Sequence, residues 1–171
     1  MNTRFKRITL SVAAVLAVLA VGTFAYLALR PSTAFAVRGN GDTVSARLGG
    51  LNGIRAFLHT RAVPAILADP ELAPFFGHLT ETPGDIEECL ARLLDHDLGG
   101  LSSKNGTQTE TGHICRSSMS NVHRGMGIDD HAFDRFIEIV GREALAAGVM
   151  PADVQEVADK LESYRGSIVR Q

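Results

Sequence analysis

The stretch that decides the fold is Met119-Ser-Asn-Val-His123-Arg-Gly-Met-Gly-Ile128, in which one histidine stands between an apolar approach and a glycine-rich exit. An unbranched apolar residue, Met119, lies four positions before His123, and Val122 directly precedes it. Neutral imidazole is the commonest protein ligand of haem iron, and one proximal histidine leaves the opposite axial position open to a gas. His123 is therefore a candidate iron ligand, provided that the surrounding chain builds an apolar slot.

Apolar residues recur at helical spacing in four segments of the chain, and no segment shows the alternation typical of a β-strand. The sequence therefore predicts an all-α class. The four stripes are Ile54, Phe57, Leu58, Ala62 and Ile66; Ile86, Cys89, Leu90, Leu93 and Leu94; Phe133, Phe136, Ile137 and Val140; and Val154, Val157, Leu161, Tyr164 and Ile168.

Prolines and acidic residues mark the predicted helix boundaries. Pro64 lies inside the first stripe and should kink or shorten its helix. Thr82-Pro83-Gly-Asp85 offers a capping threonine, a proline in the first turn and an acidic third position, which together predict the start of the second helix. Asp129 or Asp130 opens the third helix, and Pro151 opens the fourth. Between the second and third helices, Gly99 to Ser118 is long and aperiodic, which is typical of a functional or mobile loop.

Composition excludes several classes of function. The 171 residues carry a net charge of −2, no Trp and only two Tyr, so we expect no nucleic-acid partner. The two cysteines, Cys89 and Cys115, form neither a CxxC nor a CxxCH motif, which argues against covalently attached haem and against a four-ligand zinc site. Neither a phosphate-binding GxxxxGK[ST] motif nor an HExxH zinc motif is present.

The N-terminal segment predicts a membrane helix. Ile8 to Leu29 runs for 22 residues without a charge, behind Arg4, Lys6 and Arg7. At 1.5 Å per residue it would cross roughly 30 Å of hydrocarbon. Its length favours a retained anchor over a cleaved signal, although Ala34-Phe35-Ala36 is a possible cleavage site. We expect an anchor or uncleaved signal at 1–30, a linker at 31–46 and a folded domain at 47–171. The positive flank should stay in the cytoplasm, placing the domain on the periplasmic side, or secreting it if the signal is cleaved.

Read together, these residues resemble a truncated haemoglobin of the first group, over roughly residues 47–170. Leu48-Gly49-Gly50 resembles the turn between the family's first two helices, and Leu98-Gly99-Gly100 the end of its distal helix. The segment from Leu67 to Phe76 resembles the helix exit whose second Phe packs on the haem face. Met119 to Ile128 resembles the proximal-histidine segment. The four motifs occur in the family's order and at about its spacing.

The resemblance implies a two-over-two helical sandwich, preceded here by one transmembrane helix, that holds haem b. It implies His123 as the proximal ligand of the iron and Phe76 against the porphyrin. An apolar slot with one imidazole agrees with the needs of haem. The residues that we expect around the cofactor are His123, Phe76, Met119, Val122, Ile86, Leu90, Val63, Leu93, Ile128, Phe133 and Phe136.

The distal side departs from the family. Where the family usually places a tyrosine that donates to bound oxygen, the matching positions hold Ala62 and Val63, and the polar distal-helix positions fall on Ile86 and Leu90. A hydrogen bond to such a ligand stabilises it by about 1–3 kcal/mol. Without one, oxygen retention should weaken by about tenfold to a hundredfold, so we expect an apolar pocket better suited to CO or NO.

The remaining histidines and the cysteines leave alternatives open. His59, His78, His96, His113 and His131 stand among polar neighbours or at element ends, and we expect them in solvent; His59 and His78 are distal ligands only if the helix register differs. Cys89 is a buried inert thiol, a thiolate ligand of ferric iron, or one half of a bridge to Cys115 that would tie the long loop to the distal helix.

Two functions follow. The first is a membrane-tethered haem protein that binds a diatomic gas (O2, NO or CO) at iron, for sensing, NO chemistry or electron transfer. Catalysis of the NO dioxygenase type would need a separate reductase as redox partner, because the chain supplies no flavin or nicotinamide domain. The second is a haem-free, globin-like interaction module of a membrane complex, favoured by the missing distal donor and the long loop before His123.

Overall fold

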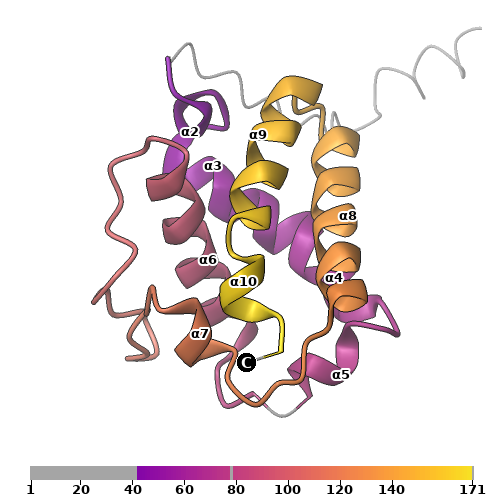
Figure 1. The fold of residues 1–171 in the computed structure, drawn as a ribbon. Helices are drawn as coiled ribbons and strands as arrows, with labels where there is room; N and C mark the ends of the chain where they lie inside the picture. Colours follow the sequence, from indigo (N-terminus) through magenta and orange to yellow (C-terminus); the bar gives the residue numbers. More distant parts are fainter. Residues whose placement is uncertain (1–41, 78, 171) are drawn as a thin grey trace, which may run out of the picture. The chain divides into compact units, whose positions relative to one another are not determined.

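The computed structural model describes residues 42–77 and 79–170, which form helices joined by turns and one long loop (Figure 1). The described residues contain no β-strand, only an isolated bridge between Gln108 and Ile114. The predicted all-α class is confirmed. The helical elements are α2 (Val44–Arg47), α3 (Gly50–Phe57), the π-helical turn η1 (Leu58–Ala62), α4 (Val63–Ala68), α5 (Ala73–Phe76), α6 (Pro83–Asp97), α7 (Met119–Val122), α8 (Asp130–Ala146), α9 (Pro151–Glu162) and α10 (Arg165–Ile168).

The predicted anchor or signal at 1–30 and most of the predicted linker lie outside the described residues. No helix within 42–77 and 79–170 combines the length and the apolar character needed to cross a membrane. Helix α2 starts inside the range predicted as linker, because Thr43 caps it and Ser45 is buried. Ser45 donates a hydrogen bond to Asp95 of α6. Helix α2 thus lies before residue 47, where the sequence analysis expects the folded domain to start.

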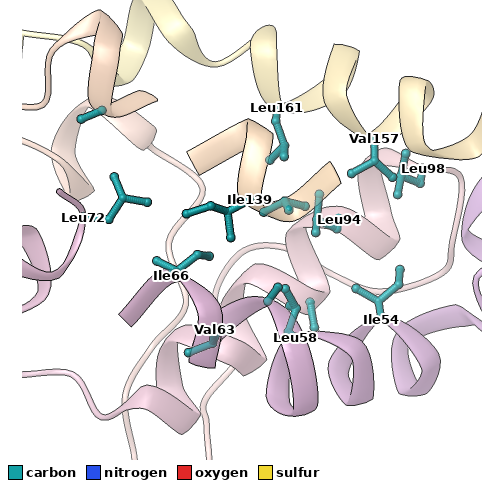
Figure 2. Packing of buried hydrophobic residues seen from close by; sticks show 14 residues of the cluster. Ile54, Leu58, Val63, Ile66, Leu72, Leu94, Leu98, Ile139, Val157 and Leu161 are labelled. Carbon is teal, nitrogen blue, oxygen red and sulfur yellow. The ribbon is translucent and has the colours of Figure 1, made fainter. Parts of the chain in front are cut away.

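Two pairs of helices carry the core. Helix α3 packs on α6 and α8 packs on α9, while η1 and α4 contact α8 and so join the two pairs. Leu58 of η1 and Leu94 of α6, from the first two stripes, come together with Ile139 of α8, as Figure 2 shows. Ile139 is not part of the third stripe. Leu58 and Ile139 are completely buried. Burying such a side chain stabilises the fold by roughly 1.5–3 kcal/mol, so these contacts fix the helix arrangement.

The helix that contains Pro64 continues through the proline instead of ending there. Proline has no N–H to donate, and in a regular α-helix its ring would press on the carbonyl of Thr60, four residues earlier. The chain relieves this with the π turn η1, in which the N–H of Val63 donates to the carbonyl of Leu58. A π turn holds one extra residue. Side chains after it therefore point one position away from where the sequence period places them.

The predicted helix starts are present, but the fourth helix is shorter than its stripe. Thr82 and Asp85 form a reciprocal capping box on α6, and Asp129 caps α8 by accepting the N–H of Ala132 at 2.8 Å. Helix α9 ends at Glu162, where the hydroxyl of Ser163 donates to the carbonyl of Lys160 at 2.6 Å. Such side-chain bonds compete with helical ones. The stripe residues Tyr164 and Ile168 consequently belong to the end of the chain around α10.

Two glycines end α6 for separate steric reasons. Gly99 has φ +87°, in the left-handed region that favours glycine. A Cβ on Gly100 would lie 2.2 Å from Oδ1 of Asp95. That carboxylate is buried and accepts hydrogen bonds from Ser45 and from the N–H of Ser102. The tight turn brings the start of the long loop back against α6.

Arg165 links α10 to α8 and α9 through ion pairs. Its guanidinium pairs with Asp130 and Asp134 of α8 and with Glu162 of α9. It also stands 4.7 Å from the centroid of the Phe133 ring, within the range of a cation–π contact. Helix α10 contacts α7, and the N–H of Arg170 donates to the carbonyl of Ile128 at 2.8 Å. The C-terminal residues thus lie against the segment that carries His123.

Candidate functional site

His123 ends the single helical turn α7, and its ring is held by the backbone of that turn. Both its N–H and its Nδ1 lie within hydrogen-bond distance of the Met119 carbonyl oxygen, at 3.0 and 2.9 Å. A carbonyl can only accept, so Nδ1 carries the proton and Nε2 is left with a free lone pair. Gly125 and Gly127, both with positive φ, then turn the chain away toward α8. This is the arrangement that orients a metal-ligating histidine.

The surroundings of His123 favour its neutral form. Burial lowers the pKa of its imidazole below the ordinary value of 6.5, and the hydrogen bond to Met119 opposes part of this shift. Neutral imidazole is the form that ligates metals. At neutral pH the ring therefore presents an unprotonated nitrogen.

His123 lines a cavity of about 330 Å³, which falls in the size range of small-molecule sites. Ten of the eleven residues predicted around a cofactor line it, from α5, α6, α7, α8 and the turn between the last two. On α6 the spacing of the three predicted residues puts them on one face of the helix. The ten are His123, Phe76, Met119, Val122, Ile86, Leu90, Leu93, Ile128, Phe133 and Phe136.

Val63, the eleventh, lies in a smaller cavity of about 100 Å³ next to the first. Phe76, Ile86 and Leu90 line both cavities. Ala62, the other position expected to replace a distal tyrosine, is completely buried in the core. Glu81 is the polar member of the smaller cavity's lining, and the rest of that lining is apolar.

The sequence did not predict the polar residues of the larger cavity. They come from the α6 entry, the long loop, α7 and the start of α10, and they are Glu81, Asp85, His113, Arg116, Asn121 and Tyr164. His113 was expected in solvent and instead lines the cavity, 3.9 Å from the carboxylate of Glu81. Of these residues, Tyr164 could have been predicted from its place in the fourth apolar stripe, whereas no sequence pattern pointed to the loop residues.

The other histidines lie as follows. The side chains of His59 and His131 are 72% and 76% exposed and pair with Glu87 and Glu71. His96 is also exposed. Neither His59 nor His96 lines the two cavities. His78 lies outside the described residues.

A disulfide between Cys89 and Cys115 decides among the three alternatives for the cysteines. Bridged sulfur offers no thiolate to an iron, and Cys89 itself lines the cavity from α6. The bridge ties the long loop to this helix, and Asp85 adds two further ties by accepting hydrogen bonds from Thr109 and Thr111, at 2.6 and 2.5 Å. These hydroxyls hold the pKa of Asp85 well below its usual range. The loop is therefore a fixed wall of the cavity.

Comparison with known proteins identifies the architecture. No protein-family model matches the chain, and no curated protein matches its sequence significantly. Among solved structures, truncated hemoglobin from Tetrahymena pyriformis, Fe(III) form, matches with a TM-score of 0.64 and 24% identity, over 76% of this chain and 100% of that one. A point mutant of that protein, also in the Fe(III) form, matches with a TM-score of 0.63 and the same identity and coverage. The chain has the truncated-haemoglobin fold.

At 24% identity the likeness is one of fold. Within the truncated-haemoglobin fold of this chain, the cavity lies among α5, α6, α7, α8, α9 and α10, with His123 on its wall. What this cavity binds has to follow from its own residues.

Proposed function

We propose that the described domain binds haem b, with His123 as the single protein ligand of the iron, and that the cofactor binds a diatomic gas. The observation that carries the proposal is the hydrogen bond from Nδ1 of His123 to the Met119 carbonyl at 2.9 Å. It leaves Nε2 unprotonated on the wall of a largely apolar cavity, where this nitrogen could serve as the protein's ligand to a haem iron.

The donor set and the walls fit this group. The residues expected to touch a porphyrin face are aromatic or aliphatic, and Phe76 and Phe136 come from different helices to the same cavity. Flat, apolar walls suit a porphyrin ring, while one imidazole suits its iron. When bound, haem would supply an iron centre able to take a diatomic gas, with His123 as the residue that holds it.

The protein's own residues would have three tasks. His123 keeps its proton on Nδ1, so the Met119 carbonyl fixes the ring and strengthens the donor character of Nε2. Phe133, almost fully buried, and its neighbours exclude water from the cavity. The fixed loop closes the side of α6 through the Cys89–Cys115 bridge.

The gas most compatible with the cavity is one that needs no hydrogen bond. Val63, Ile86 and Leu90 stand where donors were expected from the resemblance, and none of them carries a hydroxyl or an amide. Oxygen, which gains most from a donor, should leave such a site quickly, whereas CO and NO depend less on one. Sensing, NO chemistry or electron transfer all fit this preference. The last two need a redox partner to reduce the iron.

We also propose that the domain works outside the cytoplasm, tethered by residues 1–30 or released after their cleavage. The Cys89–Cys115 bridge supports this location, because disulfides persist in oxidising compartments. A reporter enzyme that folds only outside the cytoplasm, fused after residue 171, tests the location. An active cytoplasmic reporter at the same junction would contradict it.

The test of haem binding uses the full-length chain in mild detergent, with haemin added to the haem-free protein. We expect a Soret band that shifts with CO after reduction, and its loss in His123→Gly. Exogenous imidazole should restore the band in that variant. The matched control is His131→Gly, an exposed histidine away from the cavity, which should keep the parent spectrum. No haem uptake by the parent chain would refute the proposal and favour the haem-free interaction module.

A further inference from the structure

We propose that Arg116 binds a carboxylate of the cofactor at the mouth of the cavity, and so sets the preference of this site for an acidic porphyrin. The inference rests on the proposed function, because it names the part of haem that this chain recognises with a charge. It assigns to the long loop a binding role beyond that of a wall.

The carboxylates around the cavity would repel an acidic cofactor unless a positive charge also faced it. The lining includes two carboxylates, Glu81 and Asp85, and one guanidinium, that of Arg116. Asp85 is buried and spends its oxygens on the hydroxyls of Thr82, Thr109 and Thr111. A cofactor that brings further carboxylates into this surrounding is stabilised only if a positive charge faces them.

The charge of Arg116 is not used by the protein. Among the arginines of the described residues, Arg116 and Arg124 form no ion pair, and Arg124 donates to the side-chain oxygen of Asn121 at 2.8 Å. The others, Arg47, Arg135 and Arg165 among them, each pair with a carboxylate. In the described part of the chain, no hydrogen bond or ion pair involves the guanidinium of Arg116. The side chain lines the cavity while its residue is exposed, which places the charge at the mouth, where water also reaches.

The disulfide holds Arg116 in this place. Cys115 directly precedes it, is 1% exposed and is bonded to Cys89 of α6, which lines the same cavity. The N–H of Cys115 donates to the carbonyl of Thr107 at 2.8 Å, and its own carbonyl accepts from the N–H of Gly106 at 3.0 Å. The backbone that carries Arg116 is therefore fixed beside α6, and less conformational entropy is lost when its side chain binds.

The chemistry of the two groups matches. Haem b carries two propionate carboxylates, both ionised at neutral pH, and a guanidinium is always charged. Its planar fork donates two parallel hydrogen bonds to one carboxylate. Because the pair would be partly solvated, its effect is that of an exposed charge pair and not of a buried one.

The experiment compares haem with its dimethyl ester, which has the same ring and iron but no carboxylate charge. Each is loaded onto the full-length chain, and the rate of release to an excess of a haem-scavenging protein is followed at the Soret band. We expect Arg116→Gln to release haem about three- to tenfold faster than the parent and the ester at the parent rate. Arg116→Lys should fall between. Arg124→Gln is the matched control, since Arg124 is exposed, pairs with Asn121 and does not line the cavity.

Salt gives a readout that needs no variant. Raising the ionic strength shortens the Debye length from about 10 Å at 0.1 M to about 3 Å at 1 M, so it should speed haem release from the parent and leave ester release unchanged. Equal effects of Arg116→Gln on haem and ester, or equal salt dependence of the two, would overturn the inference while haem binding stands. A parent chain that takes up neither porphyrin overturns the proposed function, and this inference with it.

Discussion

Removing the Cys89–Cys115 disulfide should lower the free energy of unfolding by about 3.5 kcal/mol. In the chain-entropy model a cross-link costs the unfolded chain about 2.1 + 1.5R ln n cal/mol/K, and the bridged residues lie 26 positions apart. At 298 K this gives about 3.5 kcal/mol, a large part of the 5–15 kcal/mol of a typical domain. The native loop keeps its ties to Asp85 through Thr109 and Thr111, so the effect should fall mainly on the unfolded state.

The assay is equilibrium urea unfolding of the haem-free, full-length chain, followed by far-UV circular dichroism. Cys89→Ala/Cys115→Ala is compared with the oxidised parent, each with and without a dithiol reductant. Reductant should bring the parent to the midpoint of the double variant and leave the variant unchanged. The reasoning fails if both cysteines of the unreduced, unfolded parent react with iodoacetamide, or if the two proteins differ by less than about 1 kcal/mol.

Three further predictions follow from the fold and the cavity. Gly100→Ala should lower the free energy of unfolding by about 1–3 kcal/mol, because the added Cβ would clash with the buried carboxylate of Asp95. The test is urea unfolding of this variant and of Gly166→Ala, a control with open space around its added Cβ. Equal midpoints of the two variants would contradict the prediction. Leu90→Gln places an amide in the lining of both cavities. It should slow oxygen dissociation from the ferrous protein by about tenfold and keep the CO dissociation rate within about twofold of the parent's. Stopped-flow measurements with an unchanged oxygen dissociation rate would contradict an apolar distal side. The free energy of unfolding of the haem-free domain should decrease as the pH falls below about 6.5. Burial lowers the pKa of His123 in the folded state, so the unfolded chain takes up this proton at a higher pH. His123→Gln should remove this pH dependence between about pH 7.5 and 5, and an identical dependence in both proteins would refute the reasoning.

Much of the fold could be predicted from periodicity and caps. The stripes that contain Leu58 and Leu94 correctly predicted buried helix faces, and the capping residues at Thr82 and Asp85 predicted the start of α6. On α8 the stripe named Ile137, which is only partly buried, and left out the completely buried Ile139. The π turn before Pro64 could not be predicted, because its extra residue depends on how the ring is relieved against the preceding carbonyl. That extra residue shifts the side chains that follow it, Val63 among them.

The candidate site likewise contains residues that could be predicted from the sequence and residues that could not. Residues on helices could be assigned to one face from their spacing, so Ile86, Leu90 and Phe136 were placed together with His123. The loop residues could not, since their positions depend on a cross-link and on hydroxyl contacts with Asp85 that no local pattern reveals. Arg116 reaches the cavity only because of those contacts.

Helix α10 closes the cavity that His123 lines, and it is synthesised after His123. Tyr164 and Ile168 line the cavity, and the N–H of Arg170 holds this end against Ile128. His123 therefore leaves the ribosome well before the residues that close its pocket. Translation proceeds at about 5–20 residues per second, so the nascent imidazole waits for seconds beside an unfinished wall. Under the proposed function, haem would then bind only after α10 has docked.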